Sequence, residues 1–181
     1  MSDKNFDVVV YGATGFTGKL VVEYMLNQYG NDESITWAIA GRSHEKLIAV
    51  RDALGISHDV ALLKVDSNDE SSVAEMVKQT KCVLTTVGPY QLYGPSIVKQ
   101  CASNGTDYVD LCGEPGWMHE MINEHAEQAR ETGARIVFSC GFDSIPFDLG
   151  VYFLQKEVIA QHGKPASNVR GRVRAMNGEF S

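Results

Sequence analysis

The sequence predicts an α/β protein built on a doubly wound parallel sheet, the Rossmann fold. An apolar run at residues 6–11 ends in three glycines spaced three apart. Apolar strand candidates then alternate with amphipathic stretches, which is the pattern of parallel β-α-β units. The chain has 181 residues, of which 44% are hydrophobic and 22% charged, so it is long enough to enclose one substantial core.

Six strands are expected where apolar runs lie between turn signals. We place them at residues 6–11, 35–40, 60–65, 82–87, 108–111 and 135–139. Two of the intervening segments carry apolar residues at helical spacing, at Leu47, Val50 and Leu54 and at Met118, Ile122, His125, Ala126 and Ala129. Ser67 and Glu70 have the spacing of a capping box, which predicts that a helix starts just after the third strand.

The glycine-rich segment after the first strand is typical of a dinucleotide-binding turn. Gly12 can take the tight turn that leaves the strand, Gly15 lets a pyrophosphate approach the backbone, and Gly18 lets the next helix pack closely. Amides at the helix N-terminus then face the phosphates. The residues predicted to bind cofactor here are Gly12, Ala13, Thr14, Gly15, Phe16, Thr17 and Gly18.

Two other interpretations compete for this turn. One is a tight turn that holds no ligand. The other is a nucleoside-triphosphate loop ending in Gly18 and Lys19, but Ala13 stands where that loop requires glycine, and Leu20 where it requires a hydroxyl residue. The spacing therefore excludes the triphosphate loop and favours a dinucleotide.

The end of the second strand favours NADP(H) over NAD. A carboxylate that would bind the ribose 2′-hydroxyl is missing, and Arg42 and Ser43 offer a guanidinium, a hydroxyl and an amide for a 2′-phosphate. Asp66 follows the third strand, where adenine is expected, although a turn or capping role fits it equally well. Val87, Gly88 and Pro89 are expected to line the nicotinamide side at the end of the fourth strand, with a simple tight turn as the alternative.

The sheet is complete before residue 141, so the C-terminal part is expected to begin something else. A loop at 141–146 leads to a helix predicted over 147–160 and a strand predicted over 169–176, which has no later strand to pair with. We expect residues 1–146 to form the dinucleotide-binding domain. Residues 147–181 would be the linking helix and first strand of a truncated second, α+β domain for substrate binding or dimerisation.

Five segments together resemble the saccharopine dehydrogenase-like oxidoreductases, especially the branch that includes trans-acting enoyl reductases. They are Tyr-Gly-Ala-Thr-Gly-Phe-Thr-Gly at 11–18, Ala-Gly-Arg-Ser at 40–43, Val-Gly-Pro-Tyr at 87–90, Tyr-Val-Asp-Leu-Cys-Gly-Glu at 108–114 and Gly-Phe-Asp-Ser-Ile-Pro at 141–146. The last three, in this order, are the more particular to the family. Saccharopine reductases proper are less similar, because their turn usually has the Gly-x-Gly-x-x-Gly form.

The resemblance implies an NAD(P)-dependent oxidoreductase that transfers hydride from NADPH to an unsaturated or imine substrate. A second domain would hold this small molecule, so the isolated chain is expected to be inactive. The sequence assigns no catalytic residue. Candidates for donating a proton or positioning substrate, each also explained by a structural role, are Tyr90, Tyr93, Asp110, Glu114 and Asp143.

Two rival functions stay open at this point. Ser139, Tyr152 and Lys156 have a spacing similar to the catalytic residues of short-chain dehydrogenases, in which the lysine lowers the tyrosine pKa. The Tyr-x-x-x-Lys pair also arises by chance on polar helices. The second rival is a non-catalytic sensor that binds NADP and reports its level to a protein partner.

Composition limits the partners. The net charge of −7 and the lack of a long basic run argue against nucleic acid. The four cysteines form no Cys-x-x-Cys pair, and Asn123 stands where a zinc-protease helix starting at His119 needs its second histidine, so no metal is expected. The N-terminus lacks a signal-peptide pattern, which predicts a cytoplasmic location. A homodimer is expected only through the C-terminal domain.

Overall fold

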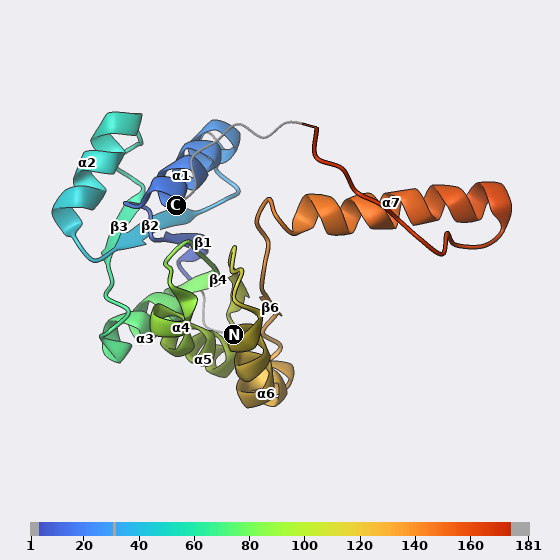
Figure 1. The fold of residues 1–181 in the computed structure, drawn as a ribbon. Coiled ribbons are helices and arrows are strands. Elements are labelled where there is room, and N and C mark those ends of the chain that lie inside the picture. The colour runs from blue at the N-terminus through green and yellow to red at the C-terminus, as the bar shows by residue number, and fades with distance from the viewer. Residues whose placement is uncertain (1–3, 31, 175–181) are drawn as a thin grey trace.

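The computed structural model describes residues 4–30 and 32–174, and these contain a six-stranded parallel sheet (Figure 1). The strand order is β3-β2-β1-β4-β5-β6. Successive strands are thus added on one side of β1 as far as β3 and on its other side from β4 onward. The strands are β1 (Phe6–Tyr11), β2 (Trp37–Gly41), β3 (Ala61–Lys64), β4 (Thr80–Thr85), β5 (Asp107–Val109) and β6 (Ile136–Val137). The predicted Rossmann fold is therefore confirmed.

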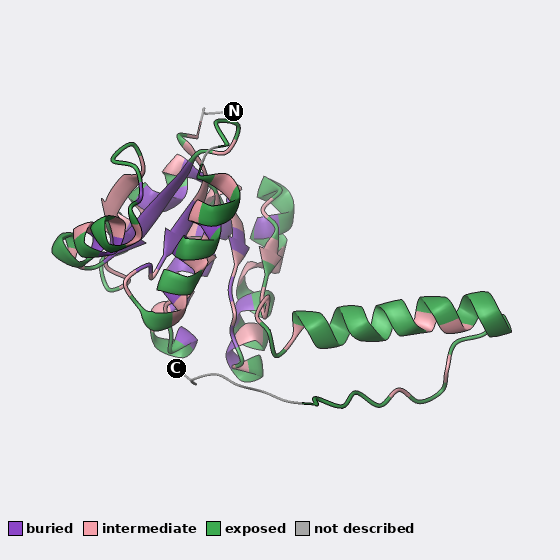
Figure 2. Ribbon diagram, turned by 90° about the horizontal axis from the view of Figure 1, so that it is seen from above, coloured by how far each residue is buried: buried purple, intermediate pink, exposed green. Residues whose placement is uncertain are grey.

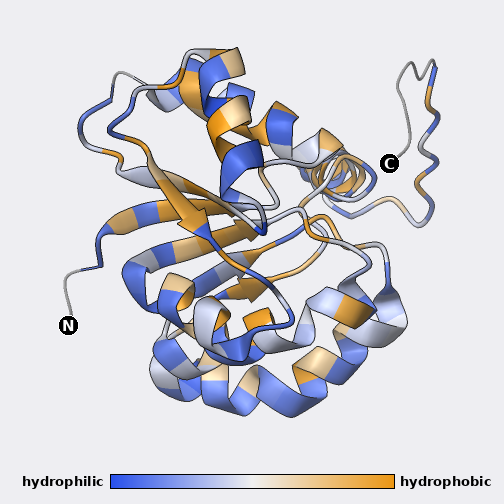
Figure 3. Ribbon diagram, turned by 90° about the vertical axis from the view of Figure 1, so that its left-hand side faces the viewer, coloured by the Kyte–Doolittle hydropathy of each residue, from blue (hydrophilic) through white to orange (hydrophobic). Residues whose placement is uncertain are grey.

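Helices form a layer on each side of the sheet (Figure 1). One layer contains α1 (Phe16–Tyr29) and α2 (His44–Leu54), and the other contains α3 (Glu70–Gln79), α5 (Pro95–Asn104) and α6 (Pro115–Thr132). A single turn, α4 (Tyr90–Tyr93), precedes α5. Successive residues of a strand point to opposite faces of the sheet, so they pack against opposite helix layers. Val9 and Val10, for example, are both fully buried, in two different core clusters. Figure 3 shows largely apolar strands between helices in which hydrophilic and hydrophobic residues alternate.

Several predicted boundaries shift. The first strand is found where predicted, whereas the fourth occupies Thr80–Thr85 instead of 82–87 and the sixth ends at Val137 instead of Ser139. The sixth strand ends early because Ser139 has φ of 59°, which is incompatible with extended backbone. Residues 86–89 belong to a loop, in which the Val87 amide donates to the Thr85 hydroxyl at 3.2 Å.

Two details of the helix predictions are wrong. Asp69, not Ser67, caps α3, because its carboxylate accepts from the Ser71 amide at 3.0 Å. The predicted apolar stripe of α6 is correct at Met118 and Ala129 but wrong at Ile122, which is 50% exposed while Trp117 and Met121 are buried. A shift of one residue turns a helical face by about 100°.

The C-terminal segment differs from the rest of the chain. Helix α7 (Ile145–His162) includes the predicted helix but buries none of its residues, and it points away from the sheet (Figures 1 and 2). The predicted strand at 169–176 is wrong as far as residue 174, and its last two positions lie outside the described residues. No strand of the described residues lies beside it. Instead the Gln155 side-chain amide binds the backbone of Ala166 at 2.8 and 2.9 Å.

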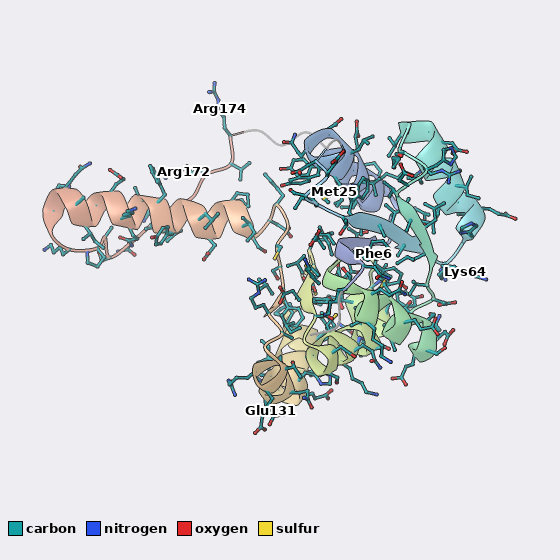
Figure 4. The ribbon with its side chains drawn as sticks, turned by 180° about the vertical axis from the view of Figure 1, so that it is seen from behind. Phe6, Met25, Lys64, Glu131, Arg172 and Arg174 are labelled. Carbon is teal, nitrogen blue, oxygen red and sulfur yellow. The ribbon has the colours of Figure 1, made fainter. Side chains whose placement is uncertain are left out.

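The tail after α7 carries Arg172 and Arg174, which stand apart from the layers that enclose Met25 (Figure 4). Among the helices that the structure describes, none has the length and apolarity needed to cross a membrane.

Candidate functional site

The glycine-rich turn packs too tightly for side chains at two of its positions. Gly12 has φ of +94°, and a Cβ there would lie 2.6 Å from the Thr86 hydroxyl oxygen. At Gly18, a Cβ would overlap the Gly12 carbonyl oxygen. The turn is also tied to β2, since the amides of Gly12 and Ala13 donate to the Ala40 carbonyl at 3.0 and 3.2 Å. Glycine at 12 and 18 thus lets β1, β4 and α1 converge.

Helix α1 begins at this turn without a side-chain cap among the described residues, and its N-cap is Gly15. The first amides of a helix have no intrahelical acceptor. Amides in this position, with the positive end of the helix dipole, favour an anionic group. The turn is therefore chemically suited to a pyrophosphate.

A first hollow of about 220 Å³ lies along the carboxyl ends of β1, β2 and β4. It brings together residues that the sequence analysis drew from three separate strand ends. Its lining residues are Tyr11, Gly12, Thr14, Gly15, Gly41, Arg42, Ser67, Thr86, Val87, Gly88 and Tyr93. Arg42 supplies the sole charged side chain of this lining, and it is positive.

A second hollow of about 620 Å³ lies on the other side of the turn, toward β5. It shares Gly15, Thr86 and Gly88 with the first hollow, so the two form one crevice across the end of the sheet. The remaining lining residues are Phe16, Thr17, Gly18, Pro89, Tyr90, Leu111, Gly113 and Glu114. In open α/β sheets, ligands bind at this place, where the strand order reverses.

Two predicted contacts have additional roles. Ser43 caps α2, since its hydroxyl accepts from the Lys46 amide at 3.3 Å. Asp66 accepts from the amide and side chain of Asn68, at 3.0 and 3.2 Å, which is the turn role named as its alternative. Ser67, rather than Asp66, lines the first hollow.

The polar candidates for catalysis fall into two groups. Asp110 is 3% exposed and accepts from the Tyr108 hydroxyl, the Cys112 amide and the Ser139 amide at 2.7 to 3.0 Å. Burial raises its pKa above the usual range, although these donors oppose the shift. The Tyr90 hydroxyl is likewise engaged, with the Thr85 carbonyl at 3.3 Å and the Leu111 amide at 3.4 Å, and burial raises the pKa of Tyr90.

By contrast, Tyr93 and Glu114 line the crevice, one in each hollow. Asp143 is exposed and lines neither hollow. Because Tyr90 also lines the second hollow, three of the five polar candidates line the crevice.

The residues of the short-chain dehydrogenase pattern are not assembled at the crevice. The Ser139 hydroxyl donates to the Cys112 carbonyl at 2.7 Å. Tyr152 is 64% exposed on α7, which leads away from the sheet, and neither it nor Lys156 lines either hollow. The geometry therefore disfavours this rival.

Thr86 is a crevice residue that sequence reasoning missed. Its hydroxyl lies 3.4 Å from the Tyr11 carbonyl and 3.3 Å from the Gly12 carbonyl, and it lines both hollows. The available signal was its position one residue past β4, the strand that pairs with β1. Among the described residues, no group of three or more His, Cys, Asp or Glu side chains is arranged to hold a metal.

Fold and crevice together define a Rossmann dinucleotide-binding domain. Residues 8–137 match the family model described as the saccharopine dehydrogenase NADP binding domain, and the chain belongs to this family. NADP(H) is thus its cofactor, and the resemblance seen in the sequence motifs is confirmed.

Similar proteins include a trans-acting enoyl reductase of Mycobacterium leprae, 46% identical over 86% of this chain and 37% of that protein. A lipid droplet localized protein of Caenorhabditis elegans is 46% identical over 83% of this chain and 36% of its own length. The chain therefore spans less than half of these relatives. A solved saccharopine dehydrogenase (L-Glu forming) from Saccharomyces cerevisiae shares the fold, with a TM-score of 0.67 at 17% identity over 87% of this chain and 32% of that one.

Proposed function

We propose that this chain is the cofactor-binding part of an NADPH-dependent oxidoreductase that reduces an unsaturated or imine substrate. The observation that carries the proposal is the crevice itself, in which the glycine turn and Arg42 line one hollow. The kinship with trans-acting enoyl reductases favours a carbon–carbon double bond as the reduced group.

In this proposal the crevice orients the cofactor along the end of the sheet. The amides of Gly12 to Gly18 bind the pyrophosphate, while Arg42 and Ser43 bind the 2′-phosphate. Asp66 and Ser67 lie on the adenine side, and Val87, Gly88 and Pro89 border the nicotinamide half. When bound, NADPH supplies the hydride; the chain supplies the binding and the orientation.

The substrate and the partner surface are assigned to a further domain. Helix α7 is apolar but buries nothing, which supports a second unit that begins close to the expected boundary between residues 146 and 147, within the first turn of α7. Substrate binding and dimerisation would depend on that unit, and the isolated chain would bind cofactor without turning it over.

The test is a calorimetric titration of the chain with NADPH and with NADH, for wild type, Arg42→Ala and Arg172→Ala. Arg172 lies on the exposed tail and serves as a matched loss of one guanidinium. Loss of a charge-assisted contact to the 2′-phosphate should weaken NADPH binding by about 30-fold and leave NADH binding unchanged. Equal NADPH affinity in wild type and Arg42→Ala would refute the assigned phosphate site.

A further inference from the structure

We propose that Glu114 is a positioning residue that holds the wall of the nicotinamide half of the crevice. The inference rests on the proposed function, because the wall matters only if the cofactor extends along it. Glu114 belongs to the loop after β5, whereas the wall, Gly88 to Gln91, belongs to the loop after β4. The side chain therefore joins two loops that are separated in sequence and adjacent at the site.

Both oxygens of the Glu114 carboxylate are used. One accepts from the Tyr90 amide at 2.8 Å and the other from the Gln91 amide at 3.0 Å. Hydrogen bonds to a carboxylate are stronger than those between neutral groups. In this arrangement the carboxylate acts as an acceptor toward backbone, so it positions the wall and does not present a proton to a substrate.

Among the described residues, the short helix in this wall, α4, has no side-chain cap of its own. The residue at the N-cap of α4 is Pro89, whose side chain makes no capping hydrogen bond and which has no amide hydrogen. The first two free amides of this turn are those of Tyr90 and Gln91, and both donate to the Glu114 carboxylate. The carboxylate of a distant loop thus replaces the local cap that the sequence omits.

Glu114 can act as an anchor because its own loop is fixed. Buried Asp110 accepts from the Cys112 amide at 3.0 Å and the Ser139 amide at 2.8 Å, which ties the loop to the segment after β6. The Leu111 amide also donates to the Tyr90 hydroxyl at 3.4 Å. Tyr90 is consequently held at both its backbone and its ring.

Pro89, Tyr90 and Glu114 line the second hollow together with the glycine turn. None of these three residues lines the first hollow, where Arg42 lies, and of the wall only Gly88 is shared between the two hollows. A loosened wall should therefore affect the half of the cofactor beyond the pyrophosphate and spare the adenosine 2′-phosphate half. This split separates positioning from a general contribution to folding.

The experiment compares binding of NADPH and of 2′,5′-ADP, which has the phosphorylated adenosine half but no nicotinamide. Calorimetric titrations are made with wild type, Glu114→Ala, the isosteric Glu114→Gln, and the control Glu120→Gln, which alters an exposed glutamate of α6. Hydrogen exchange of the segment from Thr86 to Tyr93 is followed in the same proteins.

We expect Glu114→Ala to bind NADPH about tenfold more weakly, because the free wall must be ordered on binding. Glu114→Gln should lie between this variant and wild type, since one amide still finds a carbonyl oxygen. Affinity for 2′,5′-ADP should change less than about twofold, and exchange at residues 86–93 should accelerate in Glu114→Ala.

Each of the following outcomes would contradict the proposal. Unchanged NADPH affinity in both Glu114 variants, or equal losses for NADPH and 2′,5′-ADP, would overturn the positioning role while leaving the cofactor site in place. A wild-type chain that binds neither ligand would refute the proposed function itself, and this role with it. Unchanged exchange in Glu114→Ala would show that the carboxylate does not restrain the wall.

Discussion

Helices α6 and α7 have similar lengths and end signals but differ in burial. Each has 18 residues, starts with a proline in its first two positions, and ends at a glycine of positive φ, 80° at Gly133 and 72° at Gly163. Helix α6 buries Trp117, Met121 and Ala129 against the sheet, whereas α7 buries nothing. Local signals are therefore sufficient to start and stop a helix, but burial depends on a partner surface.

The apolar residues of α7 are spread around its whole circumference. Its exposed large side chains are Ile145, Phe147, Leu149, Val151, Tyr152, Phe153, Leu154 and Ile159. A helix that is apolar all round is typical of one enclosed by other elements. This contrast with α6 is the structural basis for proposing a second unit that begins at α7.

The largest difference is expected when an aromatic ring is removed from each helix. Trp117 is 3% exposed, and its ring lies 5.7 Å from that of Tyr90 and 5.5 Å from that of Phe138, between centroids. Trp117→Ala should cost about 3–5 kcal/mol of unfolding free energy, measured by urea denaturation. Phe153→Ala, at a ring that is 65% exposed, should cost less than about 0.5 kcal/mol. Similar losses in the two variants would contradict the contrast.

A second pair concerns helical glycines. A Cβ at Gly18 in α1 would overlap the Gly12 carbonyl oxygen, whereas one at Gly150 in α7 would meet nothing within 4 Å. Gly18→Ala should destabilise the domain by about 1–3 kcal/mol and abolish NADPH binding. Gly150→Ala should stabilise its helix by about 0.5–1 kcal/mol and leave binding intact. The prediction fails if Gly18→Ala binds NADPH normally.

A smaller, pH-dependent effect is expected at Asp7. Its carboxylate binds the Lys81 ammonium at 2.7 Å and the amide and hydroxyl of Thr36 at 2.8 and 2.9 Å. The Lys81 contact, followed by those to Thr36, lowers the pKa of Asp7 from 3.8 to about 2. The folded state thus gains stability above pH 3.8, and loses it as the pH falls toward 2.

At neutral pH, Asp7→Asn should therefore cost about 1 kcal/mol in urea denaturation. The difference from wild type should shrink steadily below pH 3.8. Asp148→Asn, at an exposed position in the first turn of α7, is the control and should show little of this pH dependence. A difference that persists unchanged at acid pH would exclude the ion pair as its cause.

The smallest effect is expected for removal of α7 and the tail. A chain ending at Pro146 should keep its melting temperature and its NADPH affinity within about twofold, because α7 buries none of its residues. Thermal unfolding and calorimetry measure both. A clear loss of either would place the domain boundary after residue 146 and contradict the separation of the two regions.

Much of the fold followed from short-range patterns. The apolar run before the glycines and the alternation of strand and helix depend on neighbours in sequence. The same holds for the lack of a carboxylate after β2, which pointed to NADP. The register of a helical face was harder, as the one-residue error at Ile122 shows. Met121 and Ile122 are both apolar, and only packing against the rest of the fold decides which of them is buried.

The amino-acid sequence by itself determined the Rossmann class, the glycine turn, the NADP preference and the position of α7. Tertiary structure decided which of the polar residues after β4, β5 and β6 meet at the crevice and what each one does. It enclosed Asp110, aimed the Glu114 carboxylate at the amides of Tyr90 and Gln91, and left no residue of α7 buried among the described residues. These outcomes depend on contacts between segments far apart along the chain, and such contacts leave no local pattern from which they could be predicted.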